Sequence, residues 1–153
     1  MKKPAAGPRL HALEISLEGI TLLMPSASVA EVINPMALTP VPFGPAWLKG
    51  VIGWRTLAVP VISFEALMGL PESGGSAASK LVIFYPLSGR SNGEFYALFA
   101  TAEPRPQTLN HSEPAATESE LRNLSYIAAG LKVDGRLMFI PDLDAIKKAF
   151  YPA

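Results

Sequence analysis

The sequence predicts a mainly β protein, a barrel or sandwich built from roughly nine or ten short strands. Turn-forming residues recur every ~8–12 residues, which is typical of such folds. Proline accounts for 15 of 153 residues, about twice the usual ~5%, and prolines interrupt helices but are tolerated at strand ends and edges. No strands alternate with long helices, so a doubly wound nucleotide-binding fold is disfavoured. We expect residues 1–9 to form a flexible arm and residues 10–150 a single domain with two lobes.

The N-terminal third predicts a strand pair, a third strand and an extended connection. From Leu13 to Glu18 apolar and polar side chains alternate, the period of a half-buried strand, with Glu14 on the polar side. Gly19 breaks this run, and the strand pair continues to Met24. A short strand at 29–33 follows, and four prolines between residues 34 and 46 restrict the backbone to extended conformations.

The central segments predict strands at 50–55 and 57–62 around a tight turn, then a helical turn over 64–68 that Gly69 and a proline end. Residues 72–79 have the composition of a solvated loop. Strands at 80–87 and 94–100 are joined by a hairpin loop rich in Gly, Ser and Asn.

The C-terminal segments begin with a polar, proline-containing stretch at 103–122, where Thr117 and Glu120 have capping-box spacing and predict a helical turn near 118–123. Strands at 126–133 and 136–140 flank an Asp-Gly pair, the strongest hairpin signal in the chain. A C-terminal helix is predicted over 142–151, with apolar residues on one face.

Composition limits the classes of function. Thirteen Lys and Arg balance thirteen Asp and Glu, whereas nucleic-acid binders carry a basic excess. The chain has no cysteine, which excludes disulfides, thiolate nucleophiles and cysteine metal sites. With no apolar segment after the N-terminal lysines, these features predict a cytoplasmic protein without membrane insertion. Charged residues make up only 17%, below the usual ~25%, so we expect an apolar contact surface.

One motif resembles a catalytic one. Residues 89–93 match G-x-S-x-G, with Glu103 and His111 following in the usual order. A nucleophile elbow needs a strained strand-to-helix turn, and this stretch has hairpin-loop composition between two strands. His11 and His111 lack metal-ligand spacing. We therefore predict no enzyme, no metal and no cofactor, and keep an esterase-type hydrolase based on Ser91 as a rival hypothesis.

Two groups of aromatic residues leave alternatives open. Phe43 and Trp47 lie in a proline-rich stretch, where they either cap the open end of a barrel or anchor a partner. Trp54 stands next to Arg55, and both residue types are common interface anchors. Arg55 either forms a structural ion pair, with Glu31 or Glu65 as partner, or contacts another protein.

The order of several segments resembles the CheW-like adaptor family of bacterial chemosensory systems, over the stretch from Leu10 to Phe150. Each motif is weak alone, but their order and spacing are specific. The matching segments are Val29–Ile33, Pro45–Gly50, Val51–Thr56, Leu57–Phe64, Tyr126–Leu131 and Leu137–Leu143.

The resemblance implies a fold of two small five-stranded SH3-like β-barrels packed together. It implies a non-enzymatic adaptor that couples the cytoplasmic tips of methyl-accepting chemoreceptors to the regulatory domain of a CheA-type histidine kinase in two-component signalling. The receptor helix would lie in an apolar groove between the barrels. The predicted partner-binding residues are Val29, Glu31, Val32, Gly50, Ile52, Trp54 and Arg55.

The sequence departs from the family at the turn that presents Arg55. Where the family has Asn-Leu-Arg-Gly, this chain has Gly53, Trp54, Arg55 and Thr56. Thr takes a positive φ less readily than Gly. The resemblance therefore implies a divergent member of the family, and it implies chemosensory clusters that control twitching motility as a setting. The alternative hypothesis is a free-standing interaction module that has lost one of these partners or self-associates.

Overall fold

The computed structural model describes residues 10–70, 80–109, 113–114 and 124–151. The predicted arm at 1–9, the loop at 72–79, the helical turn near 118–123 and His111 therefore lie outside the described residues.

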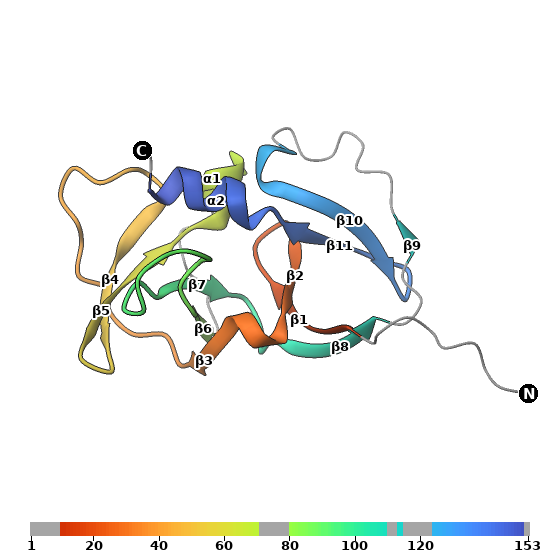
Figure 1. Ribbon diagram of the computed structural model, residues 1–153, viewed down its shortest axis with the longest axis horizontal. Helices are drawn as coiled ribbons and strands as arrows, with labels where there is room; N and C mark the ends of the chain where they lie inside the picture. The colour runs from red at the N-terminus through yellow and green to blue at the C-terminus, as the bar shows by residue number, and fades with distance from the viewer. Residues whose placement is uncertain (1–9, 71–79, 110–112, 115–123, 152–153) are drawn as a thin grey trace, which may run out of the picture.

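The described residues form two β-sheets that lie side by side (Figure 1). The first sheet has the order β8-β1-β2-β11-β10-β9. Its strands are β1 (Leu10–Ser16), β2 (Thr21–Pro25), β8 (Arg105–Leu109), β9 (Glu113–Pro114), β10 (Ile127–Val133) and β11 (Arg136–Pro141). It contains both the first and the last strands of the chain, and β2 and β11 pair in parallel, with Leu22 opposite Phe139.

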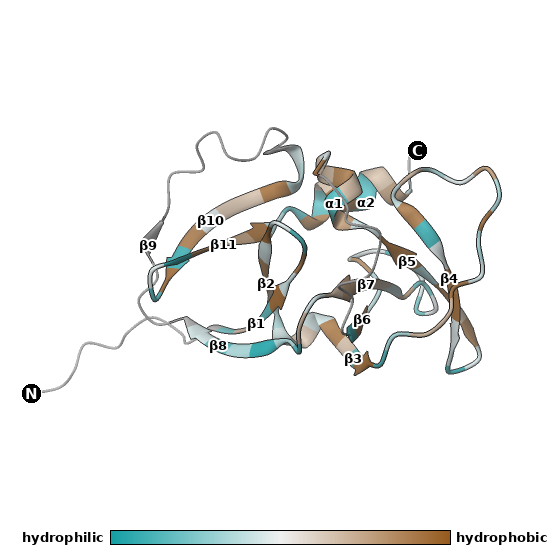
Figure 2. Cartoon of the chain, turned by 180° about the vertical axis from the view of Figure 1, so that it is seen from behind, coloured by the Kyte–Doolittle hydropathy of each residue, from teal (hydrophilic) through white to brown (hydrophobic). Residues whose placement is uncertain are grey.

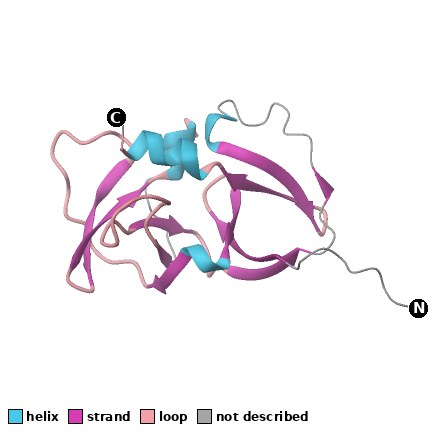
Figure 3. Ribbon diagram, viewed as in Figure 1, coloured by secondary structure: helices cyan, strands magenta, loops and turns pink. Residues whose placement is uncertain are grey.

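The second sheet is built from one continuous stretch of chain and has the order β3-β6-β7-β5-β4. Its strands are β3 (Val29–Ile33), β4 (Leu48–Trp54), β5 (Leu57–Ile62), β6 (Lys80–Phe84) and β7 (Tyr96–Ala100). Strands dominate the molecule (Figure 3), and the mainly β, two-lobed fold is confirmed. In the described part of the chain, hydrogen bonding closes neither sheet into a barrel, and the two-residue β9 gives the first sheet six strands instead of five.

Two short helices and two 3-10 turns complete the fold: α1 (Phe64–Met68), α2 (Leu143–Phe150), η1 (Ser26–Ser28) and η2 (Leu124–Tyr126). Ser63 caps α1 by accepting a hydrogen bond from the backbone N–H of Ala66 at 3.1 Å. Asp142 caps α2 in the same way, at 3.1 Å from Ala145. The predicted helical turn at 64–68 and the predicted C-terminal helix are therefore confirmed.

The apolar core has three parts. The largest lies between the sheets and takes buried side chains from both, including Leu22, Phe139, Val82 and Leu98. A second part lies on the second sheet and takes buried side chains from β4, β5, β6 and β7. A third, small part around Met138 lies on the first sheet. Strands of both sheets therefore bury residues on both faces.

This two-sided burial corrects the prediction for Glu14. Its side chain is only 2% exposed, although the alternation in β1 placed it on a polar face. Glu14 lies on the side of β1 that faces the small core of the first sheet, because Ala12, two residues earlier, belongs to that core. Its carboxylate is held by arginines from β8 and β11.

The polar stretch at 103–122, for which no strand was predicted, contains the strand β8. Residues Arg105 to Leu109 pair antiparallel with β1, with Pro106 opposite Leu13. This strand lies at the edge of its sheet, where a proline and hydrophilic side chains are tolerated, as the teal residues of β8 in Figure 2 show. Its composition therefore carries no strand signal.

Candidate partner-binding site

Three of the predicted site residues form one cluster, which we call the Glu31 cluster: Glu31, Trp54 and Arg55. Glu31 lies on β3, at one edge of the second sheet, whereas Trp54 ends β4 at the other edge. The Glu31 Oε1 atom accepts hydrogen bonds from Trp54 Nε1 at 2.9 Å and from Arg55 Nη2 at 3.3 Å. The Arg55 guanidinium carbon lies 4.4 Å from the centre of the Trp54 ring. Side-chain contacts thus join the two edge strands. Of the two predicted ion-pair partners of Arg55, Glu31 and Glu65, the structure shows Glu31.

The two contacts of Glu31 differ in energy. Trp54 is 8% exposed, and leaving the N–H group of a buried indole without an acceptor costs about 1–3 kcal/mol. The ion pair joins side chains that are 62% exposed for Arg55 and 41% exposed for Glu31. Such a surface pair contributes about 0–1 kcal/mol. Glu31 therefore holds Trp54 in place, while the Arg55 guanidinium faces solvent and can bind another molecule.

Arg55 lies at the tip of a strained hairpin. Trp54 pairs with Leu57, so the loop has only two residues, Arg55 at φ 48° and Thr56 at φ 61°. Two positive φ values identify a type I′ turn, which normally contains Asn-Gly. The other two-residue hairpin, at Asp134 and Gly135, uses residues suited to it. The chain therefore keeps the tight turn, although a β-branched residue occupies the position best suited to glycine.

We expect Thr56→Gly to raise the free energy of unfolding by about 0.5–1 kcal/mol. The left-handed conformation costs a non-glycine residue about 1–2 kcal/mol, and the flexibility of glycine in the unfolded chain offsets part of this gain. Chemical denaturation measures the difference. Thr56→Ala, which keeps the Cβ atom, serves as the control. If the Thr56→Gly protein is no more stable than the Thr56→Ala protein, the positive φ of Thr56 does not strain the turn.

Two aromatic residues that the sequence analysis did not single out extend the site. The Phe95 ring centre lies 4.9 Å from that of Trp54 and 5.6 Å from that of Tyr85. Tyr85 is 48% exposed, one of the four large apolar side chains exposed in the described part of the chain. No sequence signal pointed to them, because the predicted strands at 80–87 and 94–100 included both residues, whereas the structure places Tyr85 just after β6 and Phe95 just before β7. The Glu31 cluster thus continues into an exposed aromatic surface.

The other predicted site residues are held by packing. Ile52 is 3% exposed and belongs to the core of the second sheet. Val29 and Val32 are half-buried against the inter-sheet core. Gly50 is buried at φ 155°, where an added Cβ atom would lie 2.8 Å from both Leu38 Cβ and the Thr39 carbonyl oxygen. A direct partner contact by any of these four residues stays a prediction.

The open alternatives for Phe43 and Trp47 separate in the structure. Trp47 packs on the inter-sheet core and stacks on Phe150 of α2 at 5.1 Å. Phe43 is fully exposed, at φ 61° in a turn that Gly44 closes on Val41. Trp47 therefore packs over the core, as the capping alternative predicted, whereas Phe43 does not.

The structure offers no support for the hydrolase hypothesis. Ser91 is exposed in the loop between β6 and β7, and the chain enters a strand after it instead of a helix. A nucleophile elbow requires a strand-to-helix turn. Among the described residues, no three His, Cys, Asp or Glu side chains gather where they could hold a metal ion. None of the described helices is long and apolar enough to cross a membrane.

Comparison with known proteins gives the family. A model described as "CheW-like domain" matches residues 11–149, nearly the whole chain. The chain belongs to the CheW-like family. The crystal structure of the scaffolding protein TtCheW from Thermoanaerobacter tengcongensis has the same fold, with a TM-score of 0.71 at 23% sequence identity. The match covers 88% of this CheW-like chain and 90% of the other. No curated protein matches the sequence.

Proposed function

We propose that this CheW-like domain is a non-enzymatic chemosensory adaptor. It links the cytoplasmic tips of methyl-accepting chemoreceptors to the regulatory domain of a CheA-type histidine kinase in the cytoplasm. A chemosensory cluster for twitching motility is the setting that fits a divergent member. The observation that carries the proposal is the Glu31 cluster, which presents the exposed Arg55 side chain from a two-residue hairpin, at a position that the resemblance to the family links to partner binding.

The geometry of the cluster suits a protein contact. Arg and aromatic residues are the side chains most enriched at interface hot spots. The Arg55 guanidinium is held by the Trp54 ring and the Glu31 carboxylate, so less side-chain freedom is lost when a partner binds. Exposed Tyr85 adds an apolar surface nearby. Affinity at one site can be modest, because repeated contacts in an array raise the effective concentration.

The test compares binding and stability in the same variants. We expect Arg55→Ala to weaken binding to the regulatory domain of a chemosensory kinase from the same organism about tenfold or more, as loss of an interface hot spot does. The free energy of unfolding should change by less than about 1 kcal/mol, because the lost ion pair is exposed. Isothermal titration calorimetry and urea denaturation measure the two effects.

Two variants of Glu31 serve as controls. Glu31→Gln keeps an oxygen that can accept the hydrogen bond of Trp54, whereas Glu31→Ala removes it and should cost about 1–3 kcal/mol. Loss of stability in Arg55→Ala as large as in Glu31→Ala would make Arg55 a structural residue. If the folded wild-type protein binds neither the kinase domain nor a receptor-tip fragment, the adaptor proposal fails.

A second candidate function is a free-standing module that has lost one partner or self-associates. It is favoured by Gly53 and Thr56, which replace the residues of the family turn beside Arg55. Separate titrations with the kinase domain and with a receptor-tip fragment distinguish the two functions, and light scattering measures self-association. Binding to only one of the two partners, or a stable dimer, supports this second function.

A further inference from the structure

The outer edge of β4 is partly occupied by the chain itself. β4 is the last strand of the second sheet, so its other side faces outward. At Val51 this side pairs with Thr39, and each residue donates its N–H to the carbonyl of the other at 2.9 Å. The edge therefore accepts a short antiparallel segment, which pairs with it at Val51.

The next outward position is open. Alternate residues of a strand direct their N–H and C=O groups to the same side, and pairing with β5 continues without a bulge from Val51 to Trp54. The N–H and C=O groups of Gly53 therefore face outward, as those of Val51 do. Gly53 is exposed, and an added Cβ atom would meet nothing within 4 Å.

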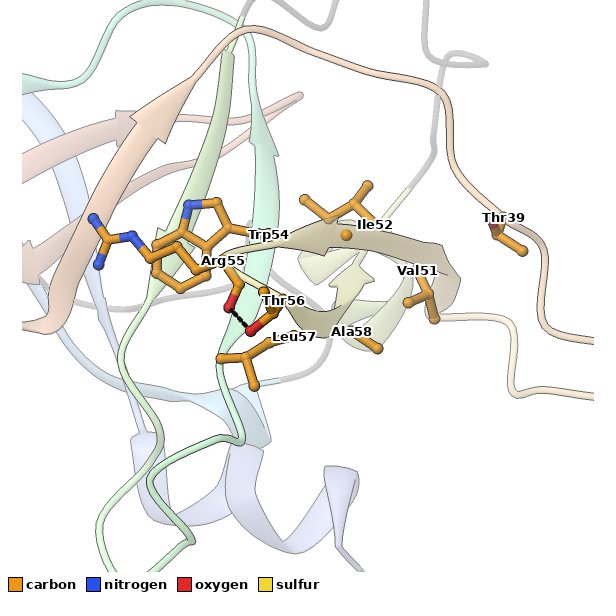
Figure 4. A pocket seen from close by; sticks show the side chains of 9 residues that line it. Thr39, Val51, Ile52, Trp54, Arg55, Thr56, Leu57 and Ala58 are labelled. Atoms are coloured by element: carbon orange, nitrogen blue, oxygen red, sulfur yellow. Dashed lines mark hydrogen bonds between the residues drawn. The ribbon is translucent and has the colours of Figure 1, made fainter.

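A shallow hollow follows this edge. Its volume is about 590 Å³, and it extends along the hairpin from Val51 to Ala58, with Thr39 at its border (Figure 4). Arg55, 62% exposed, lies among its lining residues. The hollow thus combines an open backbone edge with a positive charge two residues further along the chain.

We propose that this edge binds an extended segment of a partner protein by β-strand addition. The segment pairs its backbone with the N–H and C=O groups of Gly53 and places a carboxylate beside Arg55. Main-chain hydrogen bonds supply the affinity in this mode of recognition, and side chains supply the specificity. The proposal shares Arg55 with the Glu31 cluster but does not rest on the adaptor function, because the backbone groups of Gly53 carry the pairing.

A second copy of this chain does not fit the same edge. If two β4 strands paired antiparallel about a two-fold axis at Gly53, Arg55 of each copy would stand opposite Val51 of the other. The edge of Val51 is already taken by Thr39. A separate short segment that pairs only at Gly53 avoids this conflict.

The test uses short random peptides displayed on phage, selected against the whole protein and then measured singly by fluorescence anisotropy. We expect the selected peptides to contain β-branched residues and an Asp or Glu. Gly53→Pro should weaken their binding about tenfold or more, because proline removes the N–H group and blocks the edge. Gly53→Ala keeps the N–H group and should bind as the wild type does. Arg55→Ala should weaken binding by a smaller factor.

The two Gly53 variants are designed to fold equally well, because the N–H of Gly53 faces away from β5 and takes no part in the hairpin. Amide hydrogen exchange of the wild-type protein gives an independent readout, in which Gly53 should gain protection when a selected peptide binds. The proposal fails if no peptide is selected, if Gly53→Pro binds as well as Gly53→Ala, or if Gly53 gains no protection. Binding of the kinase domain to Gly53→Pro, measured in parallel, reports on the adaptor function separately.

Discussion

Replacing Arg136 with Met should lower the free energy of unfolding by about 3 kcal/mol at neutral pH, the cost of leaving a buried charge without its main partner. The charge is Glu14, which is 2% exposed. Its carboxylate accepts hydrogen bonds from Arg136 Nη2 at 2.5 Å and from Gln107 Nε2 at 2.8 Å. Arg105, whose Nη2 lies 3.7 Å away, remains in the variant and keeps the loss at the low end of the range.

The effect of Arg136→Met should depend on pH. Burial raises the pKa of Glu14, but the hydrogen bonds from Arg136 and Gln107, together with the positive charges of Arg136 and Arg105, outweigh it, so the pKa in the folded protein is below its ordinary value. A depressed pKa stabilises the folded state above the ordinary pKa of Glu, and this stabilisation is lost as the pH falls through the folded pKa. The Arg136→Met variant lacks one of the hydrogen bonds that depress this pKa. Acid should therefore lower its free energy of unfolding less than that of the wild type.

Urea denaturation at pH 7 and at about pH 3.5 measures this dependence, since Glu titrates near ~4.3 in unfolded chains. The gap in stability between wild type and Arg136→Met should narrow in acid. The double variant Glu14→Gln with Arg136→Met, which has no buried charge, should recover part of the loss at pH 7. An equal gap at both pH values would show that Arg136 acts through packing alone.

The second large effect is expected at Gly50. Gly50→Ala should lower the free energy of unfolding by about 3 kcal/mol, because overpacking and an unfavourable φ each cost about 1–3 kcal/mol. The new Cβ atom would lie 2.8 Å from Leu38 Cβ and the Thr39 carbonyl oxygen, and the φ of 155° is rarely adopted by other residues.

Gly53→Ala, in the same strand, is the matched control for Gly50→Ala. Its Cβ atom meets nothing within 4 Å, so its stability should equal that of the wild type or slightly exceed it. Thermal denaturation of both variants measures the difference. If both alanines are tolerated, Gly50 is not required for the close approach of the 38–39 segment to β4.

The sequence analysis predicted the local elements well. Val29–Ile33 forms the predicted strand, Phe64–Met68 the predicted helical turn, and Asp134 and Gly135 the predicted hairpin. Each of these depends on residues that are neighbours in the chain, where propensities and turn chemistry act directly. β8 was missed because its pairing with β1 joins residues far apart, and its composition reflects an edge position.

Contacts between residues far apart in the sequence also limited the prediction of the candidate site. The sequence left Glu31 and Glu65 open as partners of Arg55, because each lies near it only after folding. In the structure, Glu65 accepts a hydrogen bond from the backbone N–H of Glu18 at 3.0 Å, and Glu31 is the residue beside Arg55. The burial of Glu14 has a similar origin, since two of its partners come from β8 and one from β11.

The first sheet combines the two ends of the chain, and this sets the order in which the protein can assemble during synthesis. The pairs of the second sheet all lie between Val29 and Ala100, so that lobe can form while the ribosome is still adding the C-terminal third. β1 and β2 pair locally, but the pairing of β2 with β11 must wait, because it closes a loop of more than a hundred residues. Until then the edge of β2 that pairs with β11 is uncovered, and a nascent chain that stalls before β11 exposes this edge to aggregation.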